Sequence, residues 1–178
     1  MKKVVIIISL ICICAVFVFS VTFAETPEQP KGQIIGPLNK KTDLRVDNIY
    51  AANCKTNCDL NDVDAFYMDK IIVGISNNYE KSGGAEVAAE IKITYYDLGL
   101  GRSVTVTKTS PSIKPHPINP WLVSVTMVDR PVLVKKSTGI RAEVKIIPPP
   151  LGPRIVTITD SDPSNNVKTV HQCGVILY

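Results

Sequence analysis

Apolar and polar residues alternate with a period of two over most of the chain beyond residue 43. The clearest case is residues 86–97, EVAAEIKITYYD, in which the intervening positions are mostly charged or polar. One face of this stretch carries Val87, Ala89, Ile91, Ile93 and Tyr95. Such alternation predicts a β-strand with one buried side and one solvated side, as in an antiparallel sheet.

Stretches of the same kind recur along the chain and are predicted to be strands. They are residues 43–51, 66–77, 102–109, 121–129, 139–147, 154–160 and 167–178. Their valine, isoleucine and threonine side chains are branched at Cβ and suit a half-buried pleated surface. Turns rich in glycine, proline, asparagine and aspartate separate them, and no window of a dozen residues keeps a helical spacing. Seven to nine short strands predict an all-β sandwich or barrel.

The first 24 residues have the order of a secretory signal peptide. Lys2 and Lys3 form a basic start, residues 4–23 are almost wholly apolar, and Thr22 and Ala24 are small residues at the −3 and −1 positions of a cut. We therefore predict cleavage after Ala24 and a secreted or periplasmic protein. The alternative is a membrane anchor, because residues 4–23 supply the roughly 20 apolar residues that a span requires.

The rest of the chain divides into a lead-in and one domain. Residues 25–42 combine prolines, glycines and charges with little periodicity, which predicts a flexible lead-in. The strand pattern then continues over residues 43–178. The run PPPLGP at residues 148–153 is interpreted as a stiff loop, because the segment after it is too short for a core of its own.

Charge gives no indication of a nucleic-acid partner. The whole chain has a net charge of +4, and removal of the signal segment with its two lysines leaves +2. The lysines and arginines are scattered, whereas nucleic-acid binding requires them on one face. Contact with a membrane is expected only through residues 4–23, if they are retained.

Two stretches, residues 70–97 and 154–170, resemble the bacterial cell-adhesion-related (CARDB-type) domain, a relative of the fibronectin-type sandwich. The matching positions are Val73, Ile75, Asn77, Gly83, Tyr96, Asp97, Asp160, Asp162, Pro163, Asn165 and Asn166. The resemblance implies an immunoglobulin/fibronectin-III-like antiparallel β-sandwich. It also implies an exported, non-catalytic module that contacts protein partners or mediates adhesion at the cell envelope. A structural subunit of an envelope assembly, or a carbohydrate- or calcium-binding domain, is the alternative.

Three cysteines remain after the signal segment, namely Cys54, Cys58 and Cys173. The thiols of exported proteins are oxidised outside the cytosol, so we expect one disulfide among the three cysteines and one cysteine left over. Cys54–Cys58 is the favoured pair because neighbours in sequence meet easily. The alternative joins either of them to Cys173, since the first and last strands of such sandwiches often lie side by side.

The acidic loop around Cys58 raises the question of a metal site. The spacing of its acids does not fit an EF-hand calcium loop, and the two cysteines lack the second half of a zinc site. A looser site formed by Asp59, Asp62 and Asp64 remains as an alternative to a solvated acidic turn. We expect no cofactor.

Residue types required for catalysis are scarce. The chain has two histidines and shows no glycine-flanked nucleophilic serine, no paired-carboxylate signature and no phosphate loop, so we expect a protein that is not an enzyme. The proline-rich stretch of residues 110–121 ends in Trp121, the single tryptophan. This side chain either covers the end of the core, which we favour, or contacts a partner.

Overall fold

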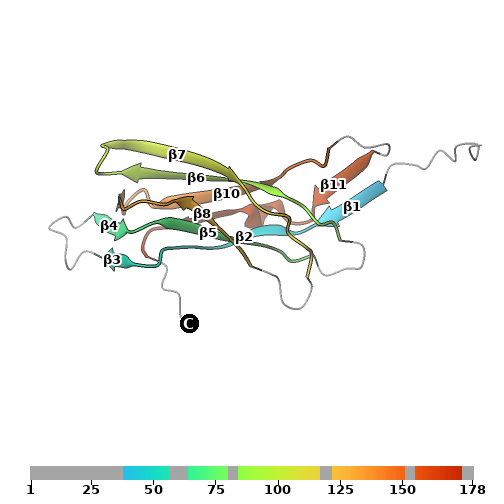
Figure 1. Cartoon of the computed structure of the whole chain (residues 1–178), viewed down its shortest axis with the longest axis horizontal. Coiled ribbons are helices and arrows are strands. Elements are labelled where there is room, and N and C mark those ends of the chain that lie inside the picture. Colours follow the sequence, from blue (N-terminus) through green and yellow to red (C-terminus); the bar gives the residue numbers. More distant parts are fainter. Residues whose placement is uncertain (1–37, 57–63, 80–83, 117–121, 151–154, 174–178) are drawn as a thin grey trace, which may run out of the picture. The chain divides into compact units, whose positions relative to one another are not determined.

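The computed structural model of the protein describes residues 38–56, 64–79, 84–116, 122–150 and 155–173, which all belong to one compact unit. They form twelve strands and a short 3₁₀ turn, η2 (Figure 1). The predicted all-β class is confirmed, with more strands in the described residues than the seven to nine expected. The elements in chain order are β1 (Leu38–Thr42), β2 (Leu44–Tyr50), β3 (Cys54–Thr56), β4 (Ala65–Met68), β5 (Ile71–Asn77), β6 (Ala89–Asp97), β7 (Arg102–Thr109), β8 (Val123–Val128), β9 (Val132–Lys135), β10 (Ile140–Ile146), β11 (Val156–Asp160), η2 (Pro163–Asn166) and β12 (Val167–Val170).

Strand β1 corrects the predicted boundary of the lead-in. We expected a flexible segment through residue 42, but Leu38–Thr42 pairs in parallel with β11 over its whole length. Its sequence, LNKKT, has no apolar alternation, so the backbone of a distant strand and not a local pattern makes it extended. The rest of the lead-in and the predicted signal segment lie outside the described residues.

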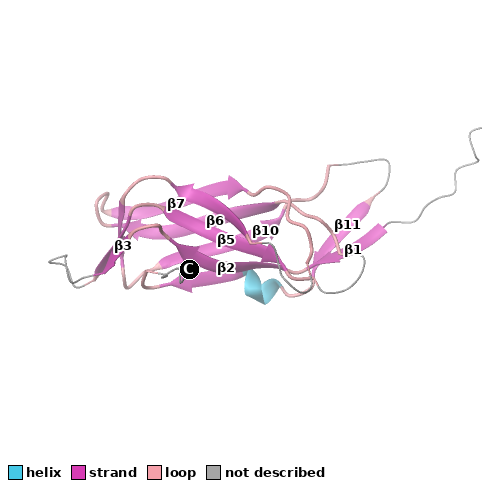
Figure 2. Cartoon of the chain, turned by 60° about the horizontal axis from the view of Figure 1, so that its bottom comes forward, coloured by secondary structure: helices cyan, strands magenta, loops and turns pink. Residues whose placement is uncertain are grey.

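Two antiparallel sheets face one another in the compact unit. The larger has seven strands in the order β12-β10-β6-β9-β4-β3, with β7 paired to β6. The smaller has the order β2-β5-β8, and β1 and β11 form a separate parallel pair. Strand β2 packs against β10 and β12 of the larger sheet and against η2, which appears in cyan in Figure 2. The result is a sandwich with β6 inside one sheet and β5 inside the other.

The alternation that predicted the strands also selects the core. The five apolar residues predicted for one face of β6 and the segment before it are all buried. On β5, which lies within the strand predicted over residues 66–77, the alternating residues Ile71, Val73 and Ile75 are fully buried. They meet the residues of β2 and β10 that have the same alternation, so one apolar layer fills the space between the sheets.

A buried asparagine joins three segments at one end of the smaller sheet. Asn77, fully buried at the end of β5, accepts hydrogen bonds at Oδ1 from the amide nitrogens of Asp43 (3.1 Å) and Tyr79 (3.4 Å). Its Nδ2 donates to the carbonyl oxygen of Ala85 at 2.9 Å. This side chain therefore replaces the ladder hydrogen bonds that the three segments lose where the sheet ends.

We predict that Asn77→Ala lowers the free energy of unfolding by about 2–3 kcal/mol, because it leaves buried backbone groups without partners. Urea unfolding followed by circular dichroism measures the change. The control is Asn39→Ala, an exposed position of β1, which should change stability by less than about 0.5 kcal/mol. Equal effects of the two substitutions would contradict the assigned role of Asn77.

Candidate functional site

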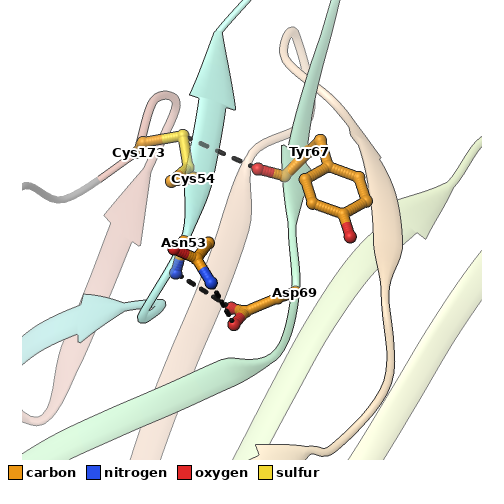
Figure 3. Close-up of a disulfide and its surroundings, with 5 residues drawn as sticks. All are labelled: Asn53, Cys54, Tyr67, Asp69 and Cys173. Atoms are coloured by element: carbon orange, nitrogen blue, oxygen red, sulfur yellow. Dashed lines mark hydrogen bonds between the residues drawn. A yellow bond between two sulfur atoms is a disulfide. The ribbon is translucent and has the colours of Figure 1, made fainter.

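A disulfide bond joins the two ends of the seven-stranded sheet (Figure 3). Cys54 is the first residue of β3 and Cys173 follows β12, the strand at the opposite end of the sheet order. Their Cα atoms are 5.9 Å apart, although 119 positions separate them in sequence. The favoured Cys54–Cys58 pairing is therefore wrong, and the long-range alternative is confirmed. Cys58 itself lies outside the described residues.

The path of the chain explains this pairing. Strand β2 belongs to the smaller sheet and β3 to the larger one, so the segment between them passes from one sheet to the other. Asn53 is fixed there by Asp69, whose carboxylate accepts from the Asn53 backbone nitrogen at 3.2 Å and from its Nδ2 at 3.3 Å (Figure 3). This crossing places Cys54 beside the end of the chain, a position that proximity in sequence does not reveal.

The disulfide is suited to a structural role in an oxidising compartment. A bond that closes a loop of this length stabilises the fold by about 5 kcal/mol on the chain-entropy account. Cys173 Sγ lies 3.9 Å from the carbonyl oxygen of Tyr67 on β4. The disulfide therefore joins the two ends of the sheet and does not close a short loop.

Of the acidic residues considered for a metal, Asp64 is used structurally. Its carboxylate oxygens accept hydrogen bonds from the backbone nitrogen and the hydroxyl of Ser137, both at 2.8 Å. This contact fastens the turn after β9 to the start of β4. Asp59 and Asp62 lie outside the described residues, and the part of the chain that is described contains no group of three metal-binding side chains.

A buried carboxylate at the end of β6 is the most prominent polar group within the structure. Asp97 is 2% exposed, and its Oδ2 lies 2.9 Å from Arg130 Nη2. Its Oδ1 accepts from the backbone nitrogens of Gly99 (3.0 Å) and Leu100 (3.4 Å) in the turn to β7. Oδ1 of Asp97 therefore holds the turn between β6 and β7, and Oδ2 pairs with Arg130, so this carboxylate stabilises the hairpin.

Tyr95 lies two positions before Asp97 on the core side of β6. Burial raises the pKa of its hydroxyl above the ordinary value of 10.0, Arg130 partly lowers it, and Asp97 raises it further. Its hydroxyl oxygen has no hydrogen-bond partner among the described residues. The hydroxyl has thus lost its hydration without gaining a hydrogen bond, so it does not stabilise the fold.

The aspartate–asparagine stretch after β11 forms a corner between strands, at one of the turns that residues of these types predicted. Asp162 accepts from the backbone nitrogen of Ser164 at 3.1 Å, and Asp160 accepts from Asn166 Nδ2 at 3.0 Å. Asn165 Nδ2 donates to Asp43 at 2.9 Å, which links the corner to the start of β2. These hydrogen bonds carry the chain from the parallel pair to β12, although the side-chain oxygens Oδ1 of Asn165 and Asn166 are buried without a partner in the described residues.

A shallow depression on the outer face of the larger sheet is lined by Lys92, Thr94, Arg141 and Glu143, a mixture of charges that selects no ligand. Trp121, predicted to cover the end of the core or to contact a partner, lies outside the described residues. Within the described ranges, no helix is long and apolar enough to cross a bilayer.

Comparisons with protein-family models, curated proteins and solved structures found no match for this chain. The functional reading therefore rests on the sequence and the geometry. Asp97, Arg130 and Asn77 are important polar positions whose contacts the sequence did not identify. A tyrosine–aspartate pair before a glycine-rich turn was the available signal for Asp97, but its partner Arg130 is 33 positions away.

We predict that Cys54 and Cys173 are recovered in one linked pair of proteolytic fragments, whereas Cys58 reacts with an alkylating reagent. Mass spectrometry of the digested, non-reduced protein measures this. The double substitution Cys54→Ser and Cys173→Ser should lower the free energy of unfolding by about 3–5 kcal/mol. The control Cys58→Ser should change it by less than about 0.5 kcal/mol, and a fragment linking Cys54 to Cys58 would contradict the assignment.

A second prediction concerns pH. Above pH 10 the Tyr95 hydroxyl ionises in the unfolded chain before it does so in the folded protein, so the folded state holds more protons and stability falls as pH rises. Tyr95→Phe removes this loss. Urea unfolding should show the two proteins within about 1 kcal/mol at neutral pH and the phenylalanine variant ahead at alkaline pH. A parallel decline of both proteins would contradict the prediction.

Proposed function

We propose that this chain is an exported, non-catalytic β-sandwich module that binds a protein partner at the bacterial cell envelope. The observation that supports it best is a pair of free strand edges. Among the described residues, β7 pairs only with β6 and β8 pairs only with β5. Free edges accept an extended segment from another protein through backbone hydrogen bonds.

Export is supported by two independent features. The long-range disulfide is of the kind that persists outside the cytosol. The first 24 residues have the basic, apolar and small-residue order of a cleaved signal. Together they favour the periplasm or the cell exterior over retention inside the cell.

The absence of a catalytic role is supported by how the polar groups are used. Asp64, Asp97 and Asp162 each bind backbone nitrogens of turns. His171 Nδ1 lies 3.1 Å from the carbonyl oxygen of Lys136. These groups hold loops together, and the resemblance to the cell-adhesion-related domain points to the same kind of module.

The alternative is a structural subunit that only spaces an envelope assembly, since the disulfide gives the sandwich rigidity. An interaction module must present a surface whose alteration releases the partner, whereas a spacer acts through its fold alone. Nothing in the described residues favours the calcium-binding alternative.

We expect the protein to be recovered from the periplasm or the medium with Glu25 as its first residue, and to capture a defined set of envelope proteins. The first point is measured by fractionation and N-terminal sequencing. The second is measured by affinity capture from envelope extract after mild crosslinking. The control bait is the same protein unfolded by reduction and alkylation.

Recovery of the intact chain in the membrane fraction would contradict cleavage and favour an anchor formed by residues 4–23. Capture of the same proteins by the folded and the unfolded bait, or of none by either, would contradict a specific interaction module.

A further inference from the structure

The two sides of the sandwich are held together differently. On one side, β2 and β3 are linked to the β12 end of the chain by the disulfide and by the hydrogen bonds of Asn165 to Asp43 and of Lys168 to the carbonyl oxygen of Asp47. On the other side, β7 and β8 are joined in the described residues by one hydrogen bond, from Lys108 Nζ to the Thr126 carbonyl oxygen at 2.7 Å. We call this second side, formed by Arg102–Thr109 and Val123–Val128, the open edge.

The backbone of β7 presents an unpaired row at the open edge. The Ser110 nitrogen donates to the Ala89 carbonyl oxygen at 2.8 Å, and β7 continues in the same register along β6. Because antiparallel pairs alternate, Val104 and Val106 then bind β6 with their backbone groups. The N–H and C=O groups of Ser103, Thr105 and Thr107 point away from β6 and find no strand among the described residues.

The apolar layer is incomplete at the same place. Val104 and Val106 of β7 and Val123 and Val125 of β8 pack against the core but are only partly buried. Elsewhere in the core, valines at corresponding positions of inner strands are fully buried, as Val73 on β5 shows. Four half-covered valines between two free edges are therefore a surface that further apolar side chains can cover.

Charge distinguishes this row from an ordinary edge. Arg102 and Lys108 share the inward parity of Val104 and Val106 and flank them at either end. Neither cation forms an ion pair within the described part of the chain. At alternate positions the edge therefore carries a cation, two valines and a second cation. This order is the same in either direction along the strand, so a partner strand can pair with it in parallel or antiparallel.

We infer that the open edge binds an extended segment of a partner protein with the pattern acidic–x–apolar–x–apolar–x–acidic. This inference rests on the proposed function and specifies its surface. The segment adds to β7 as a further strand, using the outward groups of Ser103, Thr105 and Thr107. Its apolar residues cover the valines, and its two acids meet Arg102 and Lys108.

A second copy of the same chain fits this edge poorly. An antiparallel pairing of β7 with itself that sets Val104 opposite Val106 also sets Arg102 opposite Lys108, which places like charges together. A shift of two residues in either direction sets one of the cations opposite a valine. Charge complementarity thus favours an acidic partner strand over self-association.

The test uses the exported protein and a nine-residue threonine peptide with aspartate at its second and eighth positions and valine at its fourth and sixth. We expect binding with a dissociation constant below about 1 mM. We also expect slower amide hydrogen exchange at Ser103, Thr105 and Thr107. Two peptides serve as controls, one with lysine in place of aspartate and one of the same composition with the valines moved to the third and seventh positions. Both should bind at least about tenfold more weakly.

Two substitutions test whether the peptide binds at the open edge. Thr105→Pro removes an outward N–H without touching the β6–β7 ladder, so it should weaken binding at least about tenfold, whereas Thr105→Ala should change it less than about twofold. Lys108→Met, which loses the Lys108 hydrogen bond to the Thr126 carbonyl oxygen without adding a negative charge, is the control for the contact between β7 and β8. Lys108→Glu, at an exposed position, should reverse the preference at that end. It should make a peptide with lysine at one end bind about threefold better than the peptide with two aspartates. The Lys108→Glu variant shows whether the acids of the peptide contact the open edge even if Thr105→Pro is unstable.

Equal affinity of the aspartate and lysine peptides, protection confined to β1 or β11, or a concentration-dependent dimer that competes with the peptide would overturn the inference. Failure of the proposed function is seen separately, in affinity capture. If the wild type and Thr105→Pro capture the same envelope proteins, the module binds a partner elsewhere and only the open edge is excluded. If the wild type captures none, the proposed function fails, while the peptide titration still decides what the edge binds.

Discussion

The structure depends on the crossing of the chain from β2 in the smaller sheet to β3 in the larger one. The Cys54–Cys173 bond fixes this crossing. Residues 44–50 belong to β2 in the three-stranded sheet, and residues 54–56 to β3 in the seven-stranded sheet. Because Cys54 ends this crossing, the disulfide fixes the first strands of the sandwich to the end of the chain. The two sheets are thereby held in contact along one side, and a single apolar layer between them becomes possible.

A sandwich closed firmly on one side need not be closed equally on the other. Asp97 in the β6–β7 hairpin and Asp64 beside Ser137 each hold a turn through hydrogen bonds. Among the described residues, the outward backbone groups of β7 have no strand partner, and four valines of β7 and β8 are only partly covered by the core. A sandwich with free strand edges at β7 and β8 is suited to adding a strand from another protein, since an edge already fixed in the fold loses little conformational entropy on binding.

Local alternation identified most of the fold. The apolar face of β6 was predicted from period-two spacing and is buried, and the strands predicted over residues 66–77 and 139–147 contain β5 and β10, whose alternating apolar residues are buried except for the partly buried Ile146. Short strands without such spacing were not found from the sequence. β3 has three residues and β9 has four, too few to establish a pattern, and β1 has a single apolar residue, Leu38, so the backbone of β11 holds it extended.

The sequence by itself therefore determined the strand class, the buried faces and the corner built from aspartates and asparagines, because each depends on neighbours within a few residues. Only the tertiary structure decided which cysteines bond, which carboxylate meets Arg130 and which strand edges stay free. Those outcomes depend on distances between residues far apart in the chain, which are set when both sheets pack on one core. Proximity along the chain favoured Cys58 as the partner of Cys54, and proximity in space selected Cys173.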